Sequence, residues 1–145
     1  MIPLFRVKMS DAASGAVSNV LASGFIGQGP VVEQFEDKLW QELESKTRPV
    51  TVNSCTAAID LALELLGVEN GDEIITTPQT CFASNVGAIH RGARIRWADI
   101  DPLTGLIQPA SVEKLITNRT KAVIAVNWAG QFCNTNRITN RSNFT

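Results

Sequence analysis

Short β-branched runs alternate with helical stretches through the middle of the chain, and this alternation limits the possible fold more than any other feature. Runs suited to strands stand at 49–52, 73–77, 93–100 and 121–128. Segments with helical composition separate them, at 56–66, 82–90 and 109–116. Repeated β-α-β-α units with short connections predict an α/β domain with a mostly parallel sheet and flanking helices.

Two helices joined by a glycine-rich loop are expected before this alternation begins. Ser10 and Asp11 begin the first helix, which ends near Gly24. The loop SGFIGQGP that follows holds three glycines and a proline. From Val31 onward, apolar residues recur three and four positions apart, which predicts the second helix.

Bulk composition excludes several classes of protein. The 145 residues suffice for one domain with a sizeable core, and the net charge of -1 gives no support for a nucleic acid partner. No apolar run is long enough to span a bilayer, and the N-terminus lacks the features of a signal peptide, so we expect a cytoplasmic protein without a membrane partner. The three cysteines lack metal-ligand spacing, which predicts reduced thiols and no metal site.

Small polar residues mark the point where the run at 49–52 passes into the next helix. They are Asn53, Ser54, Cys55 and Thr56. In open α/β sheets, ligands bind beyond the carboxyl ends of the strands. A helix start placed there offers free backbone N–H groups and a partial positive charge, which favour a phosphate. The alternative is that Ser54 or Thr56 simply caps the helix, which is the commoner role of such residues.

Glycine motifs for nucleotides are absent from this stretch. It lacks the lysine and glycine spacing of a P-loop and the glycine fingerprint of dinucleotide-binding proteins. Both absences count against an NTPase and against a small nucleotide-binding oxidoreductase.

Four segments carry a resemblance to a known family when they are taken in order. They are SGFIGQGPVVEQFEDKL, VNSCTAAIDLALELLGVENGDEIITTPQTCFASNVGAI, GARIRWADIDPLTG and TKAVIAVNWAGQ. Together they resemble the DegT/DnrJ/StrS nucleotide-sugar aminotransferases, which are pyridoxal 5'-phosphate (PLP) enzymes of the aspartate-aminotransferase fold. The resemblance implies a partial, truncated large domain over 1–130, in which 1–30 form the N-terminal helix and active-site loop. The asparagine-rich segment 131–145 does not match, and we expect it to be disordered.

The resemblance implies roles for the small polar residues and for one aromatic ring. Ser54, Cys55 and Thr56 stand in the family's phosphate-binding turn, where Cys55 replaces a smaller residue. The backbone N–H groups of Cys55 and Thr56, with the Thr56 hydroxyl, would hold the phosphate of PLP. Phe82 would stack on the pyridine ring, and the residues after it, Ser84 and Asn85, would line the same pocket. The alternative for Phe82 is a core aromatic on a helix that faces the sheet.

No catalytic residue is assigned in this chain. The family's Schiff-base lysine and the carboxylate that pairs with the pyridine nitrogen lie beyond the matched segments, and no lysine present stands in that context. We therefore expect the N-terminal fragment of an aminotransferase, inactive and association-prone when alone. The full-length family would transfer an amino group from a donor such as glutamate to a nucleotide-linked keto-sugar, in surface-polysaccharide or amino-sugar biosynthesis, as a homodimer. The alternative is a non-catalytic phosphate-binding α/β module, or a subunit completed by another chain.

Overall fold

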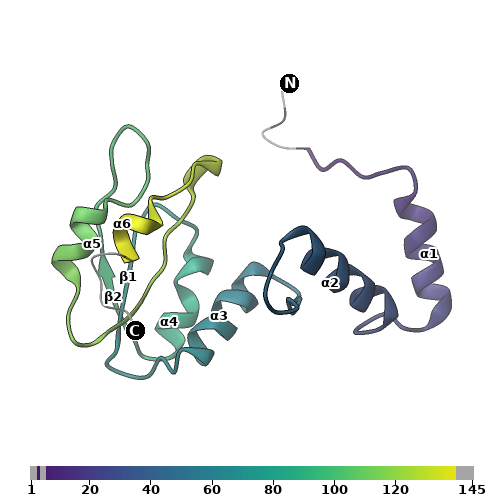
Figure 1. The fold of residues 1–145 in the computed structure, drawn as a ribbon, viewed down its shortest axis with the longest axis horizontal. Helices are drawn as coiled ribbons and strands as arrows, with labels where there is room; N and C mark the ends of the chain where they lie inside the picture. Colours follow the sequence, from purple (N-terminus) through teal and green to yellow (C-terminus); the bar gives the residue numbers. More distant parts are fainter. Residues whose placement is uncertain (1–2, 4–5, 140–145) are drawn as a thin grey trace. The chain divides into compact units, whose positions relative to one another are not determined.

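The computed structural model describes residue 3 and residues 6–139, and the chain divides into two compact units, 1–51 and 52–145. The first unit holds two helices (Figure 1), α1 (Ala13–Ser23) and α2 (Pro30–Glu42). Both predicted helices of this region are therefore confirmed.

Glycine and proline set the boundaries of these two helices. Gly24 adopts φ 77°, a left-handed conformation that ends α1, and its N–H donates to the Leu21 carbonyl at 3.3 Å. Pro30 occupies the first turn of α2, where a missing N–H costs nothing. The loop between the helices lies where its glycines and proline predict it.

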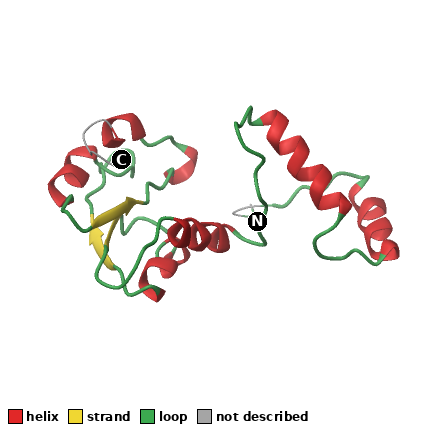
Figure 2. Cartoon of the chain, turned by 60° about the horizontal axis from the view of Figure 1, so that its bottom comes forward, coloured by secondary structure: helices red, strands yellow, loops and turns green. Residues whose placement is uncertain are grey.

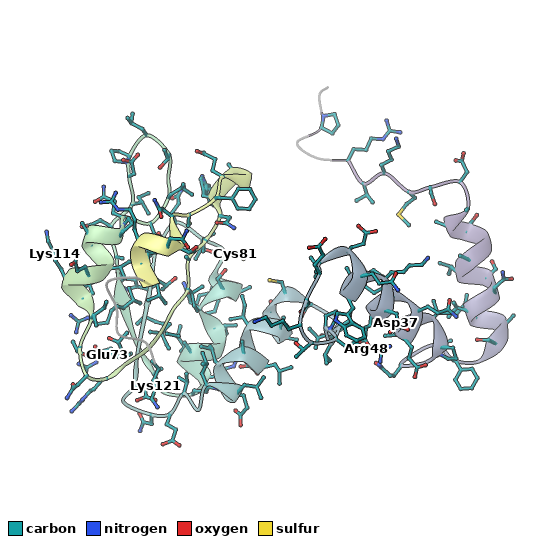
Figure 3. The ribbon with its side chains drawn as sticks, viewed as in Figure 1. Asp37, Arg48, Glu73, Cys81, Lys114 and Lys121 are labelled. Carbon is teal, nitrogen blue, oxygen red and sulfur yellow. The ribbon has the colours of Figure 1, made fainter. Side chains whose placement is uncertain are left out.

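The predicted strand at 49–52 is absent, and this expectation is wrong. The N–H and the hydroxyl of Thr51 both donate to Glu36 Oε1, each at 2.9 Å. A strand needs a neighbour for its backbone groups, and here a carboxylate from α2 takes the Thr51 N–H. Arg48 adds to the same arrangement, because its Nε lies 2.9 Å from Asp37 Oδ1 (Figure 3).

A parallel three-stranded sheet forms the centre of the second unit, as predicted. Its strands are β1 (Glu73–Thr76), β2 (Arg94–Trp97) and β3 (Thr120–Val123). The order is β2-β1-β3, so that β1 is central and pairs in parallel with both neighbours. Helices surround the three strands (Figure 2). They are α3 (Cys55–Leu65), η1 (Phe82–Ser84), α4 (Val86–His90), α5 (Pro109–Leu115), η2 (Trp128–Gly130) and α6 (Thr135–Thr139).

The central strand separates two hydrophobic clusters. Ile74 and Ile75 are both fully buried, and successive side chains on a strand point to opposite faces. Ile74 belongs to a cluster with Leu63 of α3 and Ala88 of α4. Ile75 belongs to a second cluster that includes Val112 of α5. The sheet is therefore covered by α3 and α4 on one face and by α5 on the other (Figure 1).

The helix expected over 82–90 is divided into two short ones. η1 ends at Ser84, and α4 begins at Val86. Asn85 lies between them with φ -113° and is only 3 % exposed. The division turns the chain just after the end of β1, which leaves η1 and its aromatic residue at the carboxyl edge of the sheet.

Residues 131–139 are ordered, which differs from the expectation of a disordered tail. Cys133 and Ile138 are buried in the cluster around Ile75. One asparagine of this segment acts as a local hydrogen-bond acceptor, since Asn134 Oδ1 accepts from the Arg137 N–H at 3.2 Å. Asn127, which precedes the segment, accepts from the Cys133 N–H at 2.8 Å through its Oδ1. Residues 140–145 of the predicted tail lie outside the described residues.

Candidate anion-binding site

Ser54 caps the helix that carries the predicted phosphate turn. Its backbone is extended, with φ -161° and ψ 157°, and its Oγ accepts the Ala57 N–H at 3.1 Å. The Ser54 carbonyl accepts from Ala58 at 3.0 Å. The capping interpretation is therefore confirmed for Ser54, whose hydroxyl fixes the geometry of the first turn.

Two N–H groups at the start of α3 stay open. Within the described part of the chain, the N–H groups of Cys55 and Thr56 have no protein acceptor. They stand in the first turn, where a helix has no internal partner for them and where its dipole is positive. Cys55 is exposed and Thr56 is half-buried, so both can be reached from solvent. Capping by Ser54 and anion binding by the next two residues are therefore compatible.

A shallow pocket of about 270 Å³ opens beside this helix start. It lies between α3 and α4, which pack against each other. Its lining is Ser54, Thr56, Ala57, Asp60, Val86, Gly87 and His90. Two of the predicted residues, Ser54 and Thr56, therefore share a pocket wall with titratable side chains from both helices.

Phe82 lies on η1, and its side chain is 66 % exposed. The alternative of a core aromatic is therefore wrong. η1 packs against α3, so the aromatic ring belongs to the element next to the helix that carries Cys55 and Thr56. The neighbouring Ser84 Oγ is 2.8 Å from Thr80 Oγ1, and the Oδ1 of buried Asn85 lacks a partner among the described residues.

An ion-pair network includes Asp60 of the pocket lining. Arg91 reaches back from the end of α4 to Asp60 and Glu64 of α3, and its side chain is 16 % exposed. Hydrogen bonds with Asp60, and then with Glu64, raise the pKa of the Arg91 guanidinium. Sequence reasoning missed this network. The spacing of Asp60 and Glu64 on one helix was visible, but their partner lies 31 and 27 residues away.

The lysines of the second unit lie away from the candidate site. Lys114 is on α5, and Lys121 is near the start of β3, at the opposite edge of the parallel sheet from η1 (Figure 3). The pocket lining contains no lysine. Within the second unit, the described residues therefore bring no amine to the turn at Cys55 and Thr56.

Solved structures match nearly the whole chain. The sugar aminotransferase CalS13 from Micromonospora echinospora is 36 % identical with a TM-score of 0.88, over 97 % of this chain and 38 % of its own. The protein Spr1654 from Streptococcus pneumoniae, solved in a PLP form, is 33 % identical with a TM-score of 0.90, over 97 % of this chain and 36 % of its own. The parallel sheet with its flanking helices is thus part of the aminotransferase fold.

The chain belongs to the DegT/DnrJ/EryC1/StrS aminotransferase family, whose model matches residues 8–143. The spore coat polysaccharide biosynthesis protein SpsC of Bacillus subtilis (strain 168) is 43 % identical over 122 residues, which is 84 % of this chain and 31 % of SpsC. The chain therefore spans about a third of the length of this relative. The family match also enters the asparagine-rich segment that the sequence resemblance left out.

No helix within residue 3 and residues 6–139 combines the length and the apolar character needed to cross a membrane.

Proposed function

We propose that this chain forms the N-terminal part of a PLP-dependent aminotransferase for nucleotide-linked keto-sugars, in surface-polysaccharide or amino-sugar biosynthesis. One observation carries the proposal: the two open N–H groups of Cys55 and Thr56 stand at a capped helix start, next to the element that exposes Phe82. The names of its relatives, a sugar aminotransferase and a spore coat polysaccharide biosynthesis protein, support the substrate class.

The residues present fit the anionic end of PLP. The N–H groups of Cys55 and Thr56, with the Thr56 hydroxyl, would hold the phosphate, because a helix start supplies both donors and a positive dipole. The exposed face of Phe82 would lie against the pyridine ring. Ser54 would keep the turn in shape through its bond to Ala57. When bound, PLP supplies the electron sink for amino-group transfer.

The cofactor would be held here without a covalent link. A lysine is needed for that link, and the pocket lining has none. We therefore propose that the chain alone binds the phosphate group but does not transfer an amino group. In the full-length enzyme, a donor such as glutamate would supply the nitrogen, and the enzyme would act in the cytoplasm as a homodimer.

A titration with PLP followed by borohydride tests this proposal. We expect a saturable change in PLP absorbance, weakened by inorganic phosphate and absent with pyridoxal, which lacks the phosphate. Borohydride fixes PLP only where it is joined to an amine, so mass spectrometry should find no stoichiometric lysine adduct. Failure to bind PLP at all would overturn the cofactor assignment. A stoichiometric adduct at one lysine would overturn the expected inactivity.

The sequence-based alternative, a non-catalytic phosphate-binding module, predicts a different outcome of the same titration. Such a module would bind inorganic phosphate and PLP equally well, because it would gain nothing from the ring. Exposed Phe82 favours the enzyme fragment, since a site for phosphate alone needs no aromatic face beside it.

A further inference from the structure

Arg91 joins two acidic residues of α3 to the backbone of α4. Its Nη1 donates to Asp60 Oδ1 and, at 3.3 Å, to the Gly87 carbonyl. Its Nη2 donates to Glu64 Oε2 at 2.9 Å. The two prongs of one guanidinium thus contact two carboxylates on successive turns of the same helix.

Both carboxylates stand on the side of α3 that carries Thr56. Thr56, Asp60 and Glu64 are spaced by four residues, which places them along one face of the helix. With a rise of about 1.5 Å per residue, Asp60 lies about 6 Å and Glu64 about 12 Å along the axis from Thr56. Asp60 and Thr56 even line the same pocket. Two negative charges therefore stand close to the N–H groups proposed to receive an anion.

Close packing of α4 keeps the guanidinium beside these charges. A Cβ added at Gly87 would lie 2.8 Å from Asp60 Oδ1 and 3.3 Å from Asp60 Cα, so a larger residue there would force Asp60 to shift. The Gly87 carbonyl accepts from Arg91 at the same point. Arg91 is consequently held beside Asp60 by the carboxylate itself and by the Gly87 carbonyl.

We propose that Arg91 keeps the start of α3 receptive to an anion, by neutralising the acidic face formed by Asp60 and Glu64. This inference rests on the proposed function of the site, and it assigns to Arg91 an electrostatic role without contact with the phosphate. Without the guanidinium, Asp60, at about 6 Å, would repel a phosphate from within one Debye length, and Glu64, at about 12 Å, would add to the repulsion at low ionic strength. The repulsion would grow with the charge of the ligand and fall with added salt.

Cys55 offers a direct probe of this potential that needs no cofactor. It is exposed and stands in the first turn of α3. Iodoacetate is an anion and iodoacetamide is neutral, and both alkylate the same thiolate. The rate with iodoacetate divided by the rate with iodoacetamide is therefore independent of the thiolate fraction. The ratio at Cys55, followed by peptide mass spectrometry, therefore reports the local potential set by Asp60, Glu64, Arg91 and the nearby His90.

We expect Arg91→Met to lower this ratio about threefold at low ionic strength. The effect should vanish near 0.5 M salt, where the Debye length falls to about 4 Å and the charges are screened from the Cys55 thiolate. The triple variant Asp60→Asn, Glu64→Gln, Arg91→Met should bring the ratio back to at least its value in the unchanged protein, because it removes two negative charges together with the one positive charge. Arg91→Lys, which retains the charge, should stay near the unchanged protein. For the dianionic phosphate of PLP, the same potential should weaken binding by about the square of that factor.

An unchanged ratio in folded Arg91→Met would overturn the inference, as would a lowered ratio that the triple variant fails to restore. Buried Cys133 controls for folding, since it should stay unreactive in an intact protein. If Arg91→Met unfolds, Asp60→Asn with Glu64→Gln is used instead. That double variant should raise the ratio, and no rise would overturn the inference. A shifted ratio in a protein that does not bind PLP would overturn the proposed function alone.

Discussion

At the scale of single residues, Ser54 caps the helix, and its neighbours in the sequence carry the proposed phosphate contacts. Ser54 uses its hydroxyl on the Ala57 N–H, and Cys55 and Thr56 are left with open N–H groups. Sequence reasoning treated these two roles as alternatives. The two roles are compatible on one helix turn, because a serine cap satisfies only one of the first N–H groups, and anion binding stays a prediction.

Phe82 gives a prediction at this scale. Phe82→Leu should weaken PLP binding about twofold to tenfold, because an aromatic stacking contact adds about 0.5–1.5 kcal/mol beyond its buried area. The melting temperature should hardly change, since Phe82 is 66 % exposed. Absorbance titration and a thermal melt measure the two effects.

Phe132 provides the matched control, because it is a second exposed phenylalanine in the same unit. Phe132→Leu should leave PLP affinity unchanged. Equal losses in both variants would argue against a specific role for Phe82.

At the scale of elements, the strands and helices of the second unit could be predicted well from alternation alone. The strand predicted at 49–52 is absent, because a strand needs a neighbouring strand, and here Glu36 accepts the Thr51 N–H instead. α6 was missed because its apolar pattern is too short to recognise, with Ile138 as the one buried residue among 135–138. The Arg91 network was missed because no local signal links residues so far apart.

Glu73 gives a prediction on the sheet. This buried residue begins β1, accepts from Thr117 Oγ1 at 2.7 Å and pairs with Arg96 Nη1 at 3.1 Å. The hydrogen bond from Thr117, and then Arg96, holds the pKa of Glu73 below its ordinary value of 4.5. A carboxyl whose pKa is lower in the folded protein than in the unfolded protein stabilises the fold at pH values above its unfolded pKa. This stabilisation is lost as the pH falls below about 4.5.

Between pH 5 and pH 3, Glu73→Gln should therefore lose less stability than the unchanged protein, because roughly one titrating group has been removed. Urea melts at a series of pH values measure this loss. Glu69→Gln, the same substitution at an exposed carboxylate nearby in sequence, is the control. The same slope in all three proteins would mean that Glu73 is not coupled to folding.

At the scale of the whole molecule, the first unit exposes much apolar surface. Val17, Leu21, Ile26 and Val31 are each more than half exposed and line a hollow of about 640 Å³. The described part of α1 has no buried residue. Contiguous apolar surface of this kind promotes association.

We therefore expect the chain to form oligomers or aggregates when expressed alone, as size-exclusion chromatography with light scattering would detect. Leu21→Gln together with Ile26→Gln should shift the population toward the monomer. Val7→Gln, an equally exposed position outside that hollow, should not. A monodisperse monomer that melts cooperatively would contradict this expectation.

The separation of Ile74 and Ile75 into different clusters has a further consequence for how this chain can vary. β1 acts as a partition: the layer with α3 and α4 bears the candidate ligand site, and the layer with α5 and α6 bears none of its residues. We therefore expect substitutions in the cluster around Ile75 to leave the residues that line the candidate pocket in place.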